Sequence, residues 1–148
     1  MAIVKKIKLA FHSHIENLDD SGNIDGYPEI TDTVFDAEMR TTDSCITLSY
    51  TENSEGGKIA CEIKARDGEI TVCRRGAINS TLVFREGESY STLYEIPPFK
   101  FDMQIKTRRL KNSLSFFGGA VDILYTMSVG GADKRCRMKL TVDGGSKL

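Results

Sequence analysis

Apolar and polar residues alternate with a period of two along much of this chain. The longest example covers residues 99–109, where one face carries Phe99, Phe101, Met103, Ile105 and Thr107. Successive side chains of a β-strand point to opposite faces of its sheet, so this pattern indicates a strand with one buried and one solvated face. Between Arg74 and Val129 no segment has the 3.6-residue period of an amphipathic helix. The pattern predicts an all-β protein.

Turn signals divide the chain into about ten such segments. Asp67-Gly68 is the strongest of them, because both residues tolerate the positive φ of a two-residue hairpin loop. Pro97-Pro98 marks a corner, since proline has no N–H to donate to a β-ladder. Strands are expected at about 7–15, 32–41, 44–52, 82–84, 89–95, 99–109, 121–129 and 136–142, with a hairpin over 58–75.

Short connections between many strands are typical of an antiparallel meander, and closure into a barrel removes its unpaired edges. We therefore expect one domain over residues 1–148, a single antiparallel up-and-down β-barrel of eight to ten strands. The alternation also predicts which side chains point inward, and a charge at Phe101 is expected to prevent folding. The inward residues are expected to include Phe11, Leu48, Ile63, Phe84, Phe101, Ile105, Ile123 and Leu140.

Residues 16–31 are rich in Asp, Asn, Gly and Ser, which predicts the longest loop of the domain, with an acidic character. From Ser21 to Asp32 the spacing of oxygen-bearing residues partly resembles a calcium-binding loop. The first position is Ser21 and the last is Asp32, where Asp and a bidentate Glu are usual, and no helices flank the segment. A plain acidic loop is the better interpretation, and calcium binding stays open. Residues 144–148 are expected to be a frayed tail.

Composition excludes few classes of protein. The 148 residues have a net charge of −1, so charge alone indicates neither nucleic acid nor a membrane as partner. Residues 100–148 hold 10 of the 20 Lys and Arg residues but 4 of the 21 Asp and Glu residues. In a closed barrel the first and last strands are usually neighbours, and ion pairs between them would account for this asymmetry.

The four cysteines, Cys45, Cys61, Cys73 and Cys136, have no C-x-x-C spacing, so separate thiols are expected. Neither an export signal nor an apolar run of about 18 residues occurs. Together these features predict a cytoplasmic protein.

Candidate chemistry is sparse. His12 and His14 lie on the same face of the first strand, which permits a metal site, although a solvated face is the better interpretation. The basic runs 106–111 and 134–139 could form a phosphate-binding surface or simply pair with acidic residues. No nucleophile elbow, phosphate loop or HExxH motif is present. We expect no catalytic site, no resident metal and no cofactor.

A set of residues spread over the second half of the chain resembles the YwiB-like family of small bacterial proteins. That family is catalogued as a domain of unknown function and grouped with the lipocalin-like (calycin) barrels, so the resemblance implies a fold and no activity. The chain departs from the family at the corner, where Pro98 and Phe99 follow Pro97. The matching residues are Arg74, Gly76, Phe84, Gly87, Glu88, Tyr94, Glu95, Pro97, Thr107, Gly118, Gly119 and Tyr125.

Several residues carried by the resemblance are more polar than a plain core requires: Arg74, Glu88, Tyr94, Glu95, Thr107 and Tyr125. They could close the ends of the barrel, or they could anchor a ligand, since a buried charge needs a partner. The sequence thus predicts a non-catalytic binding or interaction module of unknown role. The alternative is an intracellular carrier that holds a small, partly apolar ligand at one end of the barrel. Any internal cavity is expected to be shallow, because the inward residues are large.

Overall fold

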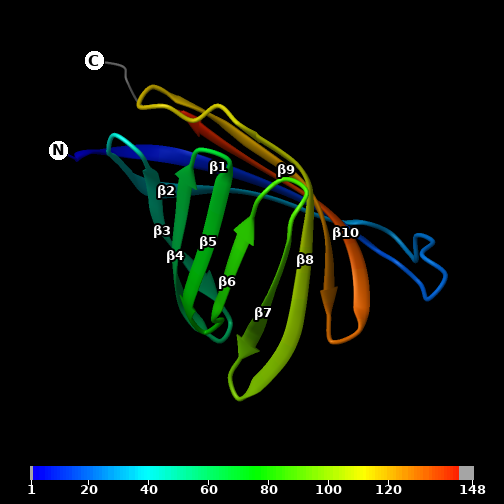
Figure 1. Ribbon diagram of the computed structural model, residues 1–148. Helices are drawn as coiled ribbons and strands as arrows, with labels where there is room; N and C mark the ends of the chain where they lie inside the picture. Colours follow the sequence, from blue (N-terminus) through cyan, green and yellow to red (C-terminus); the bar gives the residue numbers. More distant parts are fainter. Residues whose placement is uncertain (1, 144–148) are drawn as a thin grey trace.

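The computed structural model describes residues 2–143, which form ten β-strands and, within that range, no helix (Figure 1). The all-β prediction is confirmed. The strands are β1 (Ile3–Asn17), β2 (Glu29–Thr41), β3 (Ile46–Ser54), β4 (Gly57–Arg66), β5 (Glu69–Gly76), β6 (Ser80–Phe84), β7 (Ser89–Ile96), β8 (Phe99–Asn112), β9 (Gly118–Val129) and β10 (Ala132–Asp143).

All ten strands belong to one antiparallel sheet with the order β6-β5-β4-β3-β2-β1-β10-β9-β8-β7. The sheet therefore consists of two meanders, β1–β6 and β7–β10, joined where β1 pairs with β10. Each meander is made of hairpins between strands that follow one another in the sequence. The expected short connections account for this simple topology.

The sheet curls until β6 and β7 lie next to each other and the barrel is nearly closed (Figure 1). Outside the regular ladders, Asn79 and Glu95 form an isolated bridge, with each N–H donating to the other's carbonyl oxygen at 2.9 Å. The 85–88 connection adds bonds between Gly87, Glu88 and Thr107. The predicted up-and-down barrel is confirmed, with a seam between β6 and β7.

The core lies inside this barrel and follows the predicted phase. Of the expected inward residues, Leu48, Ile63, Phe84, Ile105, Ile123 and Leu140 are buried, and Phe11 packs half-buried against them. Across the β1–β10 pair, Arg135 Nε donates to Glu16 Oε1 at 3.1 Å. Part of the charge asymmetry is therefore resolved by pairing between the first and last strands, as expected.

Phe101 was expected in the core, and the structure corrects this: it is 38% exposed. Its phase is right, because it lies opposite the inward-facing Tyr94 in the β7–β8 ladder. However, the β8–β9 ladder ends at the pair Met103 and Val129, so Phe101 extends past the end of β9. The neighbouring residue there is Gly130, which has no side chain to cover the ring. A charge at Phe101 is thus not expected to prevent folding.

The predicted 16–31 loop is shorter in the structure, because β1 continues to Asn17 and β2 begins at Glu29. Residues 18–28 form the loop itself, at the far right of Figure 1. Asp19 organises it: its Oδ1 accepts hydrogen bonds from the backbone N–H groups of Ser21 and Asn23, both at 2.9 Å. The predicted frayed tail, 144–148, lies outside the described residues.

Candidate functional site

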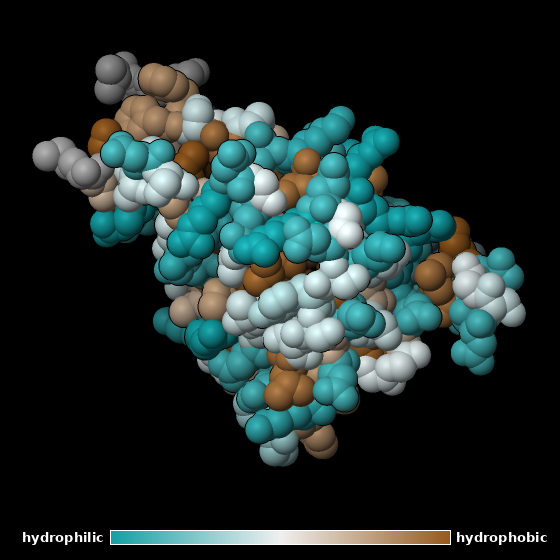
Figure 2. Space-filling model, in the orientation of Figure 1, coloured by the Kyte–Doolittle hydropathy of each residue, from teal (hydrophilic) through white to brown (hydrophobic). Residues whose placement is uncertain are grey.

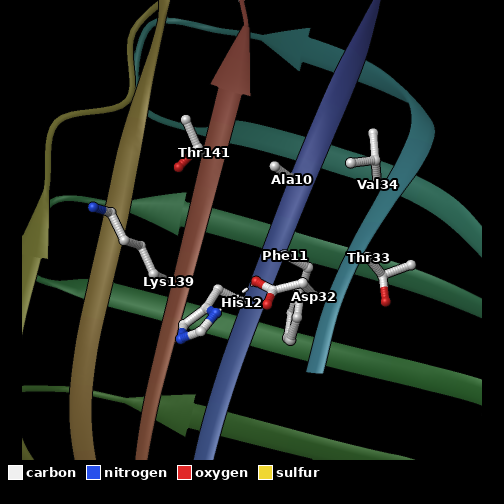
Figure 3. A pocket seen from close by; sticks show the side chains of 8 residues that line it. All are labelled: Ala10, Phe11, His12, Asp32, Thr33, Val34, Lys139 and Thr141. Atoms are coloured by element: carbon white, nitrogen blue, oxygen red, sulfur yellow. Dashed lines mark hydrogen bonds and ion pairs between the residues drawn. The ribbon is translucent and has the colours of Figure 1, made fainter. Parts of the chain in front are cut away.

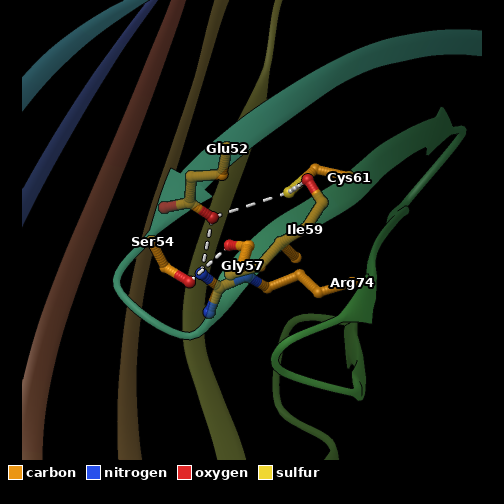
Figure 4. Close-up of polar contacts among 6 residues, drawn as sticks. All are labelled: Glu52, Ser54, Gly57, Ile59, Cys61 and Arg74. Atoms are coloured by element: carbon orange, nitrogen blue, oxygen red, sulfur yellow. Dashed lines mark hydrogen bonds and ion pairs between the residues drawn. The ribbon is translucent and has the colours of Figure 1, made fainter.

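An ion pair faces the interior at one end of the barrel. This lower end is formed by the turns that follow β3, β5, β7 and β9, at the bottom of Figure 1. Arg74 of β5 donates from Nη2 to Glu52 Oε2 of β3 at 2.5 Å (Figure 4). The two side chains are 24% and 33% exposed. An inward ion pair of this kind is unusual, since desolvating two charges costs energy that a hydrophobic pair would not cost.

Strand pairing explains why these two residues meet. Cys61 of β4 lies opposite Tyr50 on one side and opposite Arg74 on the other. Glu52 lies two residues beyond Tyr50, so it has the same inward phase. The Sγ of Cys61 lies 3.6 Å from Glu52 Oε2, which therefore contacts both the guanidinium and the thiol (Figure 4).

The site is electrostatically coupled. Burial alone would lower the pKa of Arg74. The hydrogen bond to Glu52 and the charge of Glu52 raise this pKa by more than burial lowers it, so the guanidinium stays charged. Burial raises the pKa of the Cys61 thiol, and the charge of Glu52 raises it again. Burial likewise raises the pKa of Tyr50, helped by Cys61 and Glu52. The site therefore holds one cation, one anion, a neutral thiol and a neutral phenol at physiological pH.

Two half-buried tyrosines, Tyr50 and Tyr94, lie near the pair. The rings of Phe35 and Tyr50 lie 4.5 Å apart, centroid to centroid, and Tyr94 packs against the same core. Tyr94 is also close enough to contribute to the raised pKa of Arg74. In the described part of the chain, Arg74 Nε and Nη1 donate to no oxygen atom. A guanidinium with spare donors next to aromatic rings can bind an anionic group of a partly apolar molecule.

The six polar residues singled out in the sequence do not form one cluster. Arg74 and Tyr94 come together at the lower end. Glu95 is next to Tyr94 in β7, but its backbone closes the seam with Asn79.

The other three singled-out residues lie away from the Arg74–Glu52 pair. Thr107 is 1% exposed and its backbone bonds to Gly87 and Glu88, so this group helps to close the upper end. The Glu88 side chain itself is 63% exposed, and its nearest cation is Arg85 at 3.9 Å. Tyr125 is buried in the core, where its ring meets Phe84 edge to face at 4.9 Å.

Sequence reasoning missed Glu52, Tyr50 and Cys61 as parts of this site. A signal was present: Ile46, Leu48 and Tyr50 share one phase, and Glu52 continues it. A carboxylate at the end of an inward run needs a partner. The partner, Arg74, could not be identified from the sequence alone, because it lies two strands away.

The two histidines lie on the outer face of the barrel, as expected. His12 Nδ1 is 2.6 Å from Asp32 Oδ1, beside an open hollow of about 220 Å³ between β10, β1 and β2 (Figure 3). Ala10, Val34, Lys139 and Thr141 complete its outer lining. Within residues 2–143 no group of three or more His, Cys, Asp or Glu is arranged to hold a metal ion. The oxygen-bearing residues of the 21–32 segment have different partners on β1: Asp32 contacts His12, and Glu29 contacts Asn17.

The basic runs lie mostly on the outer face, and most cations of the run on β10 are paired. Arg137 forms two hydrogen bonds with Asp122, at 3.1 and 2.7 Å. These bonds lower the pKa of Asp122 and raise that of Arg137. Since Arg135 pairs with Glu16, the last strand presents fewer free cations than the sequence suggested.

The fold and the site define a β-barrel with a polar pair at one end, and comparisons place it in a family. The chain belongs to the family described as Domain of unknown function (DUF1934), whose model matches residues 14–140. It is 28% identical over 116 residues to the "Uncharacterized beta-barrel protein YwiB" of Bacillus subtilis, covering 74% of this chain and 82% of that protein. The crystal structure of the YwiB protein from Bacillus subtilis superimposes with a TM-score of 0.83 at 26% identity, over 97% and 94% of the two chains. The resemblance seen in the sequence is confirmed, and no specific activity comes with it.

Stability should fall at alkaline pH. Burial raises the pKa of Cys136 from 9.0 to about 11 and also raises the pKa of Tyr50 and Tyr125. The folded state thus keeps these groups neutral while the unfolded chain ionises. The contribution of the neutral Cys136 thiol to the free energy of unfolding is fully present below pH 9. It is lost as the pH rises towards 11 and amounts to on the order of 2 kcal/mol. Urea unfolding between pH 7 and 11 measures this loss, and Cys136→Ala should flatten the profile. Equal profiles would contradict the assignment.

Proposed function

We propose that this protein is a non-catalytic binding module whose ligand site is the lower end of the barrel. The observation that carries the proposal is the inward Arg74–Glu52 pair near half-buried aromatic rings. A filled barrel needs no such pair, and retaining one costs desolvation energy. A site that anchors a polar group of a ligand explains that cost.

The chemistry of the lower end favours a small molecule with an apolar body and one anionic group. The spare donors of Arg74 suit a carboxylate, sulfonate or phosphate, and Tyr50, Tyr94 and Phe35 suit an apolar body. This is the carrier alternative that the sequence left open. Two half-buried free thiols, Cys45 and Cys73, suit a reducing compartment, so we propose a cytoplasmic protein of a bacterium with a lipocalin-like role.

Native mass spectrometry of the purified protein, before and after unfolding, tests whether a ligand is carried from the cell. A small mass that is reproducibly lost on unfolding supports the carrier. If no mass is lost and no anionic probe binds, the barrel is a filled scaffold and the proposal is wrong.

Replacing Arg74 by leucine should weaken binding of an anionic apolar probe, anilinonaphthalene sulfonate, about tenfold or more. A hydrogen bond to a charged group contributes about 1.5–3 kcal/mol, and 1.4 kcal/mol is a factor of ten. Fluorescence titration measures the affinity, with circular dichroism to show that the variant is folded. Arg135→Leu is the matched control, because it breaks an ion pair on the outer face. Equal affinities of the two variants would exclude Arg74 as the anchor.

A second candidate is an interaction module that meets another protein through its surface. The observation that favours it is a strand edge of β2 that has no neighbour in the sheet formed by the described residues.

Within residues 2–143 there is no helix long and apolar enough to span a bilayer.

A further inference from the structure

Among the described residues, 2–143, the first half of β2 has a strand neighbour on one side only. It pairs with β1 along its whole length, but its ladder with β3 covers only Glu38 to Thr41. On the N-terminal side of Glu38, β2 and β3 diverge, and this part of β2 runs beside β1 alone, next to the 18–28 loop (Figure 1). Residues 29–37 are therefore a free strand edge, which we call the β2 edge. An exposed edge of this length is a template for pairing with another strand.

The backbone groups that point to the β2 edge can be identified. The N–H of Thr42 donates to the carbonyl of Cys45 at 2.9 Å and closes a two-residue turn. In an antiparallel pair, hydrogen-bonded residues alternate with non-bonded ones, so even-numbered residues of β2 direct their N–H and C=O groups to the β3 side. Along the edge these are Ile30, Asp32, Val34 and Asp36.

The side chains of these four residues lie on the outer face and form an alternating apolar and acidic row. Val34 is 64% and Ile30 is 57% exposed. Asp36 pairs with Lys8 of β1, and Asp32 Oδ1 lies 2.6 Å from His12 Nδ1. One of the two charges that would protect this strand edge is thus already paired within its own sheet, and two large apolar side chains remain uncovered. Figure 2 shows brown side chains at the right of the molecule, where the β1–β2 hairpin lies.

We propose that the β2 edge binds a second copy of this chain, antiparallel, with the two-fold axis at Thr33. Val34 of each copy then lies opposite Asp32 of the other, and Ile30 lies opposite Asp36. By symmetry each of these two pairs occurs twice in the dimer. Each of the four resulting pairs exchanges two backbone hydrogen bonds. The two sheets become one continuous sheet across the axis.

The sequence of the edge favours this register over its neighbours. A shift of one residue places bonding residues opposite non-bonding ones, so no ladder forms. A shift that centres the axis on Asp32 places two Asp32 carboxylates opposite each other, and an axis at Val34 places Asp32 opposite Asp36. Like charges directly opposite each other are destabilising. The axis at Thr33 uses the whole edge and places every carboxylate opposite an apolar residue.

Two substitutions at Val34 test the register, because they remove the same apolar side chain and introduce opposite charges. Val34→Asp places carboxylates opposite Asp32 of the other copy, twice per dimer, and should weaken dimerisation about tenfold. Val34→Lys places an ammonium there and should preserve the dimer. Sedimentation equilibrium up to about 1 mM protein measures both dissociation constants, and circular dichroism confirms that the monomers are folded.

A cross-link provides a second measurement. At the axis the two Thr33 side chains form a non-hydrogen-bonded pair, with Cβ atoms about 4.5–5.5 Å apart. Under mild oxidation, Thr33→Cys should give a covalent dimer whose linked peptides contain position 33 of both copies. The wild-type protein, with its four native cysteines, is the control.

Three results would overturn the proposal. The first is a wild-type protein that stays monomeric at about 1 mM. The second is a dimer that both Val34 variants leave equally strong or equally weak. The third is an extended peptide from another protein that occupies the edge while the chain itself does not associate.

Discussion

Phe84→Ala should lower the free energy of unfolding by about 3–5 kcal/mol. Phe84 is fully buried at the end of β6, beside the seam, and its ring packs edge to face on Tyr125. Removing it leaves a cavity among buried neighbours, and the β5–β6 ladder, in which Phe84 lies opposite Ile70, keeps the backbone from closing the gap. The loss is a large part of the 5–15 kcal/mol that a domain of this size has. Urea unfolding at pH 7 measures it.

Phe101→Ala is the matched control, since it removes the same side chain from the same inward phase. Because Phe101 is 38% exposed beyond the end of β9, its loss should cost about 1 kcal/mol or less. Equal losses for the two variants would show that the lower end is as well covered as the centre of the barrel, contrary to the structure.

Gly76→Ala should cost about 3 kcal/mol or more and should also disturb the site. Gly76 has a φ of +137°, and a Cβ there would lie 2.2 Å from the carbonyl oxygen of Lys58. An unfavourable φ costs about 1–3 kcal/mol, and the backbone contact must be relieved as well. Relief would separate the ends of β4 and β5, two residues from Arg74. The variant should therefore lose probe binding together with stability.

Gly68→Ala separates the two causes. Gly68 also has a positive φ, +71°, but a Cβ there would meet no atom within 4 Å. Only the conformational cost remains, about 1 kcal/mol. Thermal unfolding of both variants provides the comparison, and similar losses would mean that the Lys58 contact at Gly76 is easily relieved.

Much of the fold could be predicted because a barrel depends on local patterns. Alternation identifies the inward face of each strand, and Asp67-Gly68 and Pro97-Pro98 mark turns whose chemistry is local. Strand ends were less predictable. β8 runs to Asn112 because a register shift between Thr107 and Arg109 restores the inward phase at Leu110. A strict alternation pattern ends before that shift.

The site was only half predictable. Arg74 and Tyr94 were singled out, but the polar residues around them were expected as one set, and the barrel separates Thr107 and Tyr125 from the lower end. Which polar residues meet depends on how far along each strand they lie. That position follows from ladder registers such as Tyr50 opposite Cys61, and the sequence does not specify these registers.

The pairing of β1 with β10 has a kinetic consequence. Both meanders are built from contacts between residues close in sequence, whereas this pair brings together residues such as Glu16 and Arg135, which are 119 positions apart. Closing so long a loop costs entropy before any contact offsets it, and folding slows as contacts become more distant. Docking of the two meanders should therefore limit the folding rate. A circularly permuted chain that starts at β7 and ends at β6 would have only consecutive strands as sheet neighbours, so it should fold faster to the same barrel.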